Sequence, residues 1–162
     1  MKQIKYKAWD NNNKKMAKVV ALDWGKSGKE DVIVTCHLEY SDGTVEKRYP
    51  MKDYGDDIEF LEYINYKDLN EKELYQSDII HYHRHEGSLG FDSTPVYKLG
   101  VIAWNDSALG YRIQPIDTHS GKVNYGVDGE KIRTSHRIVK VGNLYESDIW
   151  ELIKKYKNGE LE

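Results

Sequence analysis

The chain has 162 residues, a formal net charge of -3 and a hydrophobic content of 39%, so one domain or two small ones can bury a core. Its single cysteine, Cys36, excludes an intrachain disulfide, and we expect a buried thiol in a reducing compartment. The sequence has no apolar run of signal-peptide length and no stretch typical of a membrane-spanning helix. We therefore expect a cytoplasmic protein without a membrane partner.

Charge is distributed unevenly along the chain. Residues 1–18 carry six lysines and one aspartate, a net charge of +5, whereas residues 51–78 carry three lysines and nine acidic residues, a net charge of -6. Asymmetry of this kind can steer partners or self-association, but it does not define a fold.

The first half of the sequence predicts β-hairpins. Alternating apolar and polar residues predict strands at 4–9 and 15–21 around an Asn-rich turn. The Gly-Lys-Ser-Gly-Lys sequence at 25–29 lacks the glycine spacing of a phosphate-binding loop, so we interpret it as a flexible loop. A β-branched run predicts a strand at 32–40, and an Asp-Gly turn leads into another strand at 45–49.

The second half predicts a further β-rich part. Residues 56–66 fit either a short helix or a strand, and the sequence leaves this choice open. A turn is predicted at 67–73, followed by a strand at 79–84. Further strands, separated by Gly-rich loops, are predicted at 97–105, 111–116 and 137–144. Short strands with this spacing indicate a small barrel rather than a parallel sheet.

One helix is predicted, near the C-terminal end. Ser147 is the predicted N-cap, and Asp148 and Glu151 suit the positive end of the helix dipole. The whole pattern predicts a mainly β protein, α+β overall. Its predicted parts are an N-terminal β-hairpin module at 1–66, a connecting turn motif at 67–80, a small β-barrel at 79–146, and a C-terminal helix and tail at 147–162.

Four segments resemble the YopX-like family of phage and prophage proteins. They are I-K-Y-K-A-W-D at 4–10 with K-K-M at 14–16, E-Y-I-N-Y-K-D-L-N-E-K-E-L-Y-Q-S-D-I-I at 62–80, G-V-I-A-W-N-D at 100–106, and V-G-N-L-Y-E at 141–146. These segments follow the family's order and cover both ends and the middle of the chain. Asn65, Glu71 and Ser77 stand where the family usually has glycine.

The resemblance implies a mainly β protein with a small SH3-like barrel in its C-terminal half. It also implies a phage or prophage gene and self-association into a homo-oligomer. The family has no established activity, so no catalytic residue is carried over to this chain. We expect no catalytic site and no cofactor.

A histidine cluster is the sharpest local feature of the sequence. His81, His83 and His85 alternate on a predicted strand and Glu86 follows, so these four residues are the candidate metal ligands. Successive histidines on one strand face lie about 6.6 Å apart, so the outer two cannot easily reach one ion. A neighbouring pair with an acidic residue could hold it. In the alternative interpretation, the residues between the histidines face the core and the imidazoles line a solvated face.

Basic residues give a second hypothesis, in which the protein binds nucleic acid. The candidates are Lys131, Arg133, Arg137 and Lys140, together with Lys5 and Lys7. Neighbouring aromatic residues, including Trp9 and Tyr125, could stack on exposed bases. Against this hypothesis, the isoelectric point near 6.1 lacks the basic character of a dedicated nucleic-acid binder, and solvated strand faces explain the same charges.

Structural roles are expected for Asp78, Trp9, Tyr75 and Tyr145. Asp78 precedes a predicted strand, where its carboxylate can accept hydrogen bonds from backbone N–H groups of the turn. Thirteen tyrosines and four tryptophans indicate core packing or a protein interface. We therefore expect a non-enzymatic accessory protein that self-associates or binds a host or phage protein. A nucleic-acid-binding barrel and a metal-dependent enzyme are the alternatives.

Overall fold

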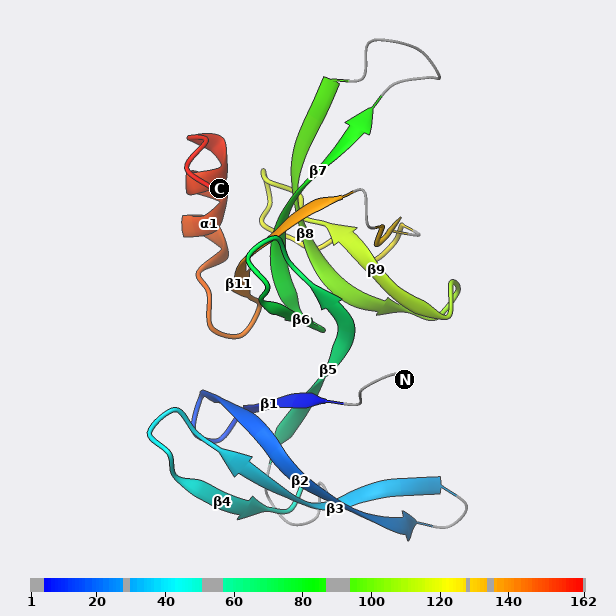
Figure 1. The fold of residues 1–162 in the computed structure, drawn as a ribbon, viewed down its shortest axis with the longest axis vertical. Coiled ribbons are helices and arrows are strands. Elements are labelled where there is room, and N and C mark those ends of the chain that lie inside the picture. Colours follow the sequence, from blue (N-terminus) through cyan, green and yellow to red (C-terminus); the bar gives the residue numbers. More distant parts are fainter. Residues whose placement is uncertain are drawn as a thin grey trace. The chain divides into compact units, whose positions relative to one another are not determined.

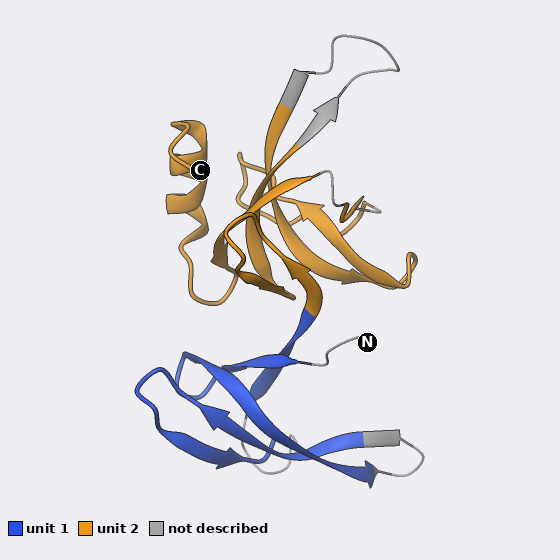
Figure 2. Ribbon diagram, in the orientation of Figure 1, with its two compact units in different colours: residues 1–63 blue, residues 64–162 orange. Residues whose placement is uncertain are grey.

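The computed structural model describes residues 5–27, 30–50, 57–86, 94–127, 129–133 and 136–161. Within them the chain forms two antiparallel sheets and one C-terminal helix (Figure 1). The mainly β fold class predicted from the sequence is therefore confirmed. The chain divides into two compact units, residues 1–63 and 64–162 (Figure 2), and the finer four-part division stays a prediction.

Hairpins build the N-terminal unit. Its strands are β1 (Tyr6–Asp10), β2 (Lys15–Ser27), β3 (Glu30–Glu39), β4 (Val45–Arg48) and the first part of β5 (Ile58–Lys67). The sheet has the order β4-β3-β2-β1-β5-β6, in which β6 (Glu73–Tyr75) belongs to the C-terminal unit. The strands predicted in the first half of the sequence are confirmed, with shifted ends.

The loop predicted at 25–29 is shorter than expected. Gly25 lies in β2 and pairs with Val32 of β3, and the ladder continues to the pair of Ser27 and Glu30. The prediction is therefore wrong for residues 25–27, while residues 28 and 29 lie outside the described residues. Regular pairing persists because the β-branched run of β3 favours extended backbone opposite the glycine.

The segment at 56–66, for which the sequence allowed a helix or a strand, is a strand from Ile58 onwards. Strand β1 pairs with it in antiparallel register, with Lys7 opposite Leu61 and Ala8 opposite Phe60. A neighbouring strand thus decided a choice that local periodicity could not make. β5 then continues without a break past Tyr63, the last residue of the N-terminal unit.

A buried carboxylate, Asp10, organises the N-terminal unit. It accepts hydrogen bonds from the Arg48 guanidinium at 2.7 and 3.3 Å and from the Tyr40 hydroxyl at 2.6 Å. It also accepts hydrogen bonds from the backbone N–H groups of Asn12 and Asn13, at 3.0 and 3.1 Å, which shape the β1–β2 turn. The neighbouring core consists of Ala8, Ala17, Cys36, Leu38 and Tyr40, so the expected burial of the single thiol is confirmed.

These contacts determine the ionisation of both acidic groups in the network. Burial raises the pKa of the Asp10 carboxyl, but hydrogen bonds from Tyr40 and Asn13 and the charge of Arg48 outweigh burial and hold that pKa below its ordinary value. Burial and the hydrogen bond to Asp10 raise the pKa of Tyr40 to about 12. At neutral pH the network therefore pairs a carboxylate with a guanidinium and a protonated phenol.

The second sheet belongs to the C-terminal unit and has the order β10-β9-β8-β7-β11. Its strands are β7 (Asp78–Glu86), β8 (Thr94–Asn105), β9 (Gly110–Pro115), β10 (Glu130–Lys131) and β11 (Arg137–Asn143). The longer strands confirm the predicted ones. β6 and β10 were missed because, at three and two residues, they are too short for an alternating pattern to reveal them.

The second sheet is curled. The Tyr82 hydroxyl of β7 donates a hydrogen bond of 3.0 Å to Glu130 of β10, although β8 and β9 lie between these strands in the sheet order. A core fills the inside of the curl, with the buried members Leu74, Ile80, Tyr82, Ile102, Ile113 and Ile138. Among the described residues no pairing joins β10 to β11, so the closed SH3-like barrel stays a prediction.

The C-terminal helix, α1 (Ile149–Lys157), packs on the other face of this sheet. Its side chains Leu152 and Ile153 join a second core with residues of β7 and β8. The N-cap is Asp148, whose carboxylate accepts hydrogen bonds from the N–H groups of residues 150 and 151, so the prediction of Ser147 is wrong by one residue. Ser147 instead accepts a hydrogen bond of 3.0 Å from the Asn143 N–H, which occupies its hydroxyl.

Candidate functional site

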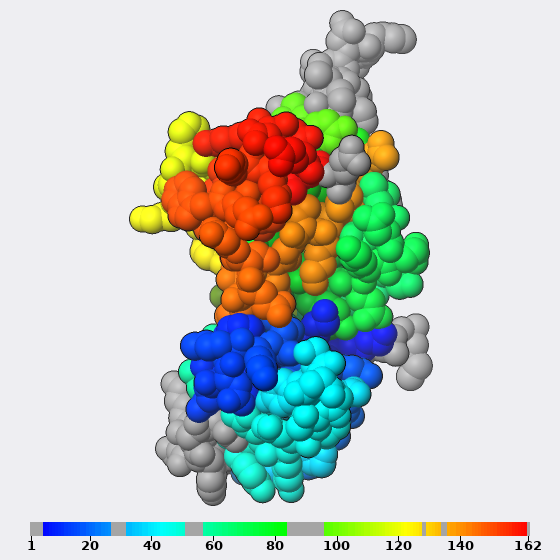
Figure 3. Space-filling model, turned by 90° about the vertical axis from the view of Figure 1, so that its left-hand side faces the viewer, coloured from blue at the N-terminus to red at the C-terminus, as the bar shows by residue number. Residues whose placement is uncertain are grey.

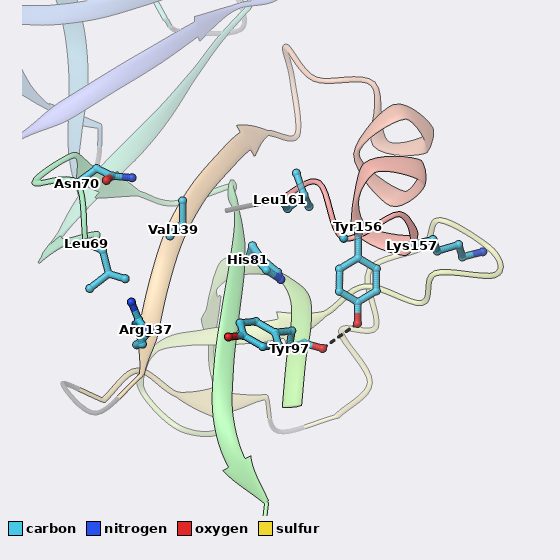
Figure 4. A pocket seen from close by; sticks show the side chains of 10 residues that line it. Leu69, Asn70, His81, Tyr97, Arg137, Val139, Tyr156, Lys157 and Leu161 are labelled. Atoms are coloured by element: carbon cyan, nitrogen blue, oxygen red, sulfur yellow. Dashed lines mark hydrogen bonds between the residues drawn. The ribbon is translucent and has the colours of Figure 1, made fainter. Parts of the chain in front are cut away.

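A groove of about 980 Å³ lies in the C-terminal unit beside β11. Val139 of β11 and His81 of β7, which are opposite each other in the sheet, belong to its lining. In Figure 3 the orange surface of β11 lies between α1, in red, and the turn around residue 70, in green. Figure 4 shows the lining side chains. Besides Val139 and His81, the lining residues are Leu69, Asn70, Tyr97, Arg137, Tyr156, Lys157, Gly159 and Leu161.

The turn that lines one side of the groove is fastened to β11 by hydrogen bonds. The Asp68 carboxylate accepts from the N–H groups of Asn70 and Lys72, at 2.8 and 2.9 Å, and from the Lys140 N–H of β11 at 3.0 Å. The Leu69 N–H donates to the Ile138 carbonyl at 3.0 Å. The exposed edge of β11 is thereby covered, and Leu69 and Asn70 are held beside the groove.

Aromatic rings meet beside the groove. Because β7 alternates, Ile80 and Tyr82 enter the core while His81 and His83 share the face that α1 packs on. The Tyr97 ring of β8 stacks on both imidazoles, at centroid distances of 5.2 Å to His81 and 5.5 Å to His83. Tyr156 of α1 contacts His81 edge-on and donates a hydrogen bond of 2.7 Å to the Tyr97 carbonyl.

The charged side chains of the groove are cationic. Arg137 of β11 and Lys157 of α1 both line it, and none of the described lining residues is acidic. Burial lowers the pKa of His81, with a further contribution from the nearby His83, so His81 is neutral at physiological pH. The groove therefore combines an apolar and aromatic interior with a small positive charge, which suits an anionic or partly apolar ligand.

A model of the YopX protein family matches residues 5–150. The chain belongs to the YopX protein family. A search of curated proteins finds no match. Among solved structures, the crystal structure of protein EF1440 from Enterococcus faecalis is similar, at 17% sequence identity and a TM-score of 0.43, over 90% of this chain and 96% of that chain. Among the described residues of this YopX-family chain, no helix has the length and apolar character needed to cross a membrane.

The candidate metal ligands of the YopX-family chain are only partly described. His81 and His83 turn towards the same tyrosine ring, and the side chains of His85 and Glu86 lie outside the described residues. Among the described residues, no group of three or more potential ligands is placed to hold a metal ion, and the four-residue site stays a prediction. The alternative interpretation was right about the core but wrong about a solvated face, since His83 is only 7% exposed.

The candidate nucleic-acid residues are spread over several elements. Lys5 and Lys7 belong to the N-terminal unit, and the Lys5 ammonium lies 5.4 Å from the Tyr63 ring centre. Lys131 and Arg137 are on β10 and β11, the first and last strands of the sheet order, and Arg133 is exposed between them. Lys140 pairs with Asp78 at 2.7 Å. Of this set only Arg137 lines the groove.

The YopX-family motif at 67–80 contains a well-connected carboxylate. Asp78, 1% exposed, accepts hydrogen bonds from the Tyr75 N–H at 2.8 Å and from the Asn143 side chain at 3.1 Å, besides its ion pair with Lys140. The Tyr75 hydroxyl donates to Glu73, and the Tyr145 N–H donates to the Asn143 side chain. Trp9 is 7% exposed, so its ring is not open to a base, whereas Tyr125, the other aromatic residue named in the nucleic-acid hypothesis, is 59% exposed.

No local sequence pattern predicts most of the groove residues. Tyr97, Val139 and Leu69 belong to three separate segments, and the sheet register and the Asp68 hydrogen bonds bring those segments together. Tyr156 belongs to α1, and its contact with His81 of β7 depends on how the helix packs on the sheet. The sequence pattern that does point to the groove is the alternation of β7, which predicts that His81 and His83 share one face of the sheet.

Proposed function

We propose that this YopX-family chain is a phage-encoded, non-enzymatic binding module that acts in the cytoplasm of the host cell. Its partner is a protein of the phage or of the host, and the binding site is the groove of the C-terminal unit. The groove carries the proposal, because it brings aromatic, apolar and cationic side chains around one space of about 980 Å³. Binding sites are commonly concave, mostly apolar and equipped with a few polar groups.

The proposed fold of the unit is a small SH3-like barrel. Support comes from the curl of the sheet, in which the Tyr82 hydroxyl reaches Glu130 across two intervening strands. Family membership supports the phage-type character of the protein. Fold by itself does not specify what a small barrel binds, so the function is argued from the groove alone.

The experiment is co-purification from phage-carrying cells, with the bound proteins quantified by mass spectrometry. Val139→Trp places a large ring in the groove and should remove the specific partners. Val45→Trp makes the same change on β4, where Val45 is 55% exposed, and should leave the partners bound. Leu161→Trp fills the groove from the tail and replaces Val139→Trp if that variant does not fold. Equal recovery of partners by all variants would contradict the proposal.

A second candidate function is self-association, favoured by apolar side chains exposed on the N-terminal unit. Trp24 and Val20, both of β2, are 57% and 46% exposed, and tryptophan is enriched at protein interfaces. Light scattering over a range of concentrations should then show a dimer or larger species that Trp24→Ser weakens. A monomer at every concentration would remove this candidate.

A further inference from the structure

Among the described residues, the two cations of the groove, Arg137 and Lys157, have no ion-pair partner, unlike other cations of the same unit. Lys140 pairs with Asp78, and Lys155 pairs with Glu151, in each case at 2.7 Å. Within the described part of the chain, no carboxylate forms an ion pair with Arg137 or Lys157. These two side chains therefore offer positive charge to a ligand rather than to the protein itself.

The two cations flank the central, aromatic part of the groove. Figure 4 shows Arg137 and Lys157 on opposite sides of His81 and Tyr97. Apolar side chains line the groove as well, namely Leu69, Val139 and Leu161, and Leu69 is 54% exposed. The complementary ligand carries negative charge at both ends and apolar groups between them.

Resting on the proposed function, we infer that the groove binds a short peptide segment of its partner protein with acidic residues at both ends and apolar residues in the middle. Arg137 pairs with one acidic end and Lys157 with the other, while the apolar side chains cover Leu69 and Val139. The guanidinium of Arg137 can hold a carboxylate with two hydrogen bonds, so we expect it to contribute more than Lys157.

A single-stranded nucleic acid would also supply negative charge, but the aromatic groups of the groove favour a peptide. Bases bind to aromatic faces that are open to them. His81 and His83 cover part of the Tyr97 ring, which is 50% exposed, and Tyr156 meets His81 edge-on. The described groove therefore offers a single half-exposed ring, not the row of open rings on which successive bases stack. The remaining nucleic-acid candidates, such as Lys131 and Arg133, are not among the lining residues.

The test is selection of a random heptapeptide display library on the full chain, followed by fluorescence anisotropy with the selected peptides. We expect selected peptides to carry Asp or Glu near both ends and Leu, Ile, Val or Phe in the centre. A labelled fifteen-nucleotide deoxythymidine oligomer, measured in parallel, should bind at least tenfold more weakly. Stronger binding of the oligonucleotide than of any selected peptide would overturn the inference in favour of nucleic acid.

Matched substitutions locate the binding site. Arg137→Ser should weaken the selected peptides about tenfold, the size expected for loss of a charged hydrogen-bonded pair of about 1.4 kcal/mol. Arg133→Ser removes an exposed arginine outside the groove and should change nothing. Lys157→Ser and Lys154→Ser make the same comparison on α1, with a smaller expected effect at Lys157. All four side chains lie on the surface or at the groove, so thermal melting should confirm that every variant folds.

The outcomes separate this inference from the proposed function. Selected peptides without acidic residues, or peptides that bind Arg137→Ser as tightly as the unmodified chain, would overturn the inference. If Val139→Trp still removed the cellular partners in that case, the binding function would stand with a different ligand chemistry. If Val139→Trp changed nothing, both would fail.

Discussion

The Arg48 guanidinium of β4 donates hydrogen bonds of 2.7 and 3.3 Å to the two carboxylate oxygens of Asp10, although 38 residues separate them in the sequence. This pair ties the last strand of the N-terminal hairpins to the first turn. Because both groups are buried, each one compensates the charge of the other, and removal of Asp10 leaves the Arg48 guanidinium with only the half-exposed Glu46 carboxylate, 3.2 Å away.

We therefore expect Asp10→Asn to lower the free energy of unfolding by about 3 kcal/mol, since breaking a buried ion pair is strongly destabilising. Urea unfolding monitored by circular dichroism measures the change. Asp42→Asn is the matched control, because Asp42 is exposed and caps the Thr44 N–H of a turn, a role that Asn fills equally well. Equal losses in the two variants would show that the Asp10 charge is unimportant.

The same carboxylate predicts part of the acid sensitivity of the protein. The folded pKa of Asp10 lies below its ordinary value of 3.8, so its stabilising contribution is present above pH 3.8 and is lost as the pH falls through the folded pKa. The melting temperature should thus decrease below pH 3.8, and Asp10→Asn should show a smaller decrease over that range. Parallel curves for the two proteins would contradict this assignment.

Asp78 should contribute more to the free energy of unfolding than a carboxylate that only caps a turn. The sequence alone predicts a loss of about 0.5–2 kcal/mol for Asp78→Ala, by analogy with helix caps. Because Asp78 also pairs with Lys140 and binds Asn143, we expect a larger loss of about 3 kcal/mol. Asp78→Asn retains an acceptor for the Tyr75 N–H and should lose less. An unfolding midpoint for Asp78→Ala equal to that of the unmodified chain would rule out the structural role.

Three positions where the family usually has glycine are held in left-handed backbone geometry. The φ angles of Asn65, Glu71 and Ser77 are 59°, 61° and 68°, a region that costs non-glycine residues about 1–2 kcal/mol. Ser77→Gly should therefore raise the free energy of unfolding by about 1 kcal/mol. Ser107→Gly is the matched control at an exposed turn without a positive φ, and it should lower stability slightly through chain entropy. A loss for both variants would contradict this explanation.

Local patterns predicted the elements whose own residues determine them. The β-branched run of β3, the Asp-Gly turn before β4 and the alternation of β7 all reflect properties of single segments. The N-cap was placed one residue early because Ser147 and Asp148 are both good caps, and only the long-range hydrogen bond from Asn143 to Ser147 distinguishes them.

The candidate site was harder to predict, because its residues come from segments far apart in the chain. The sequence predicts His81 as a metal ligand, yet its ring stacks on Tyr97, which no local pattern connects with it. Arg137 was counted with a basic run, but strand register places it opposite His83 rather than beside the other basic residues. Tertiary pairing, and not composition, thus decides which side chains share the groove.

Strand β5 has a practical consequence for dividing the protein. It runs without interruption from Ile58 to Lys67, and the two units meet within it, after Tyr63. Its first residues pair with β1, whereas Ile64 and Tyr66 pack on the core around Leu74. A cut at Tyr63 would leave a frayed strand end in each half, so separate expression of the halves calls for overlapping fragments that each include residues 58–67.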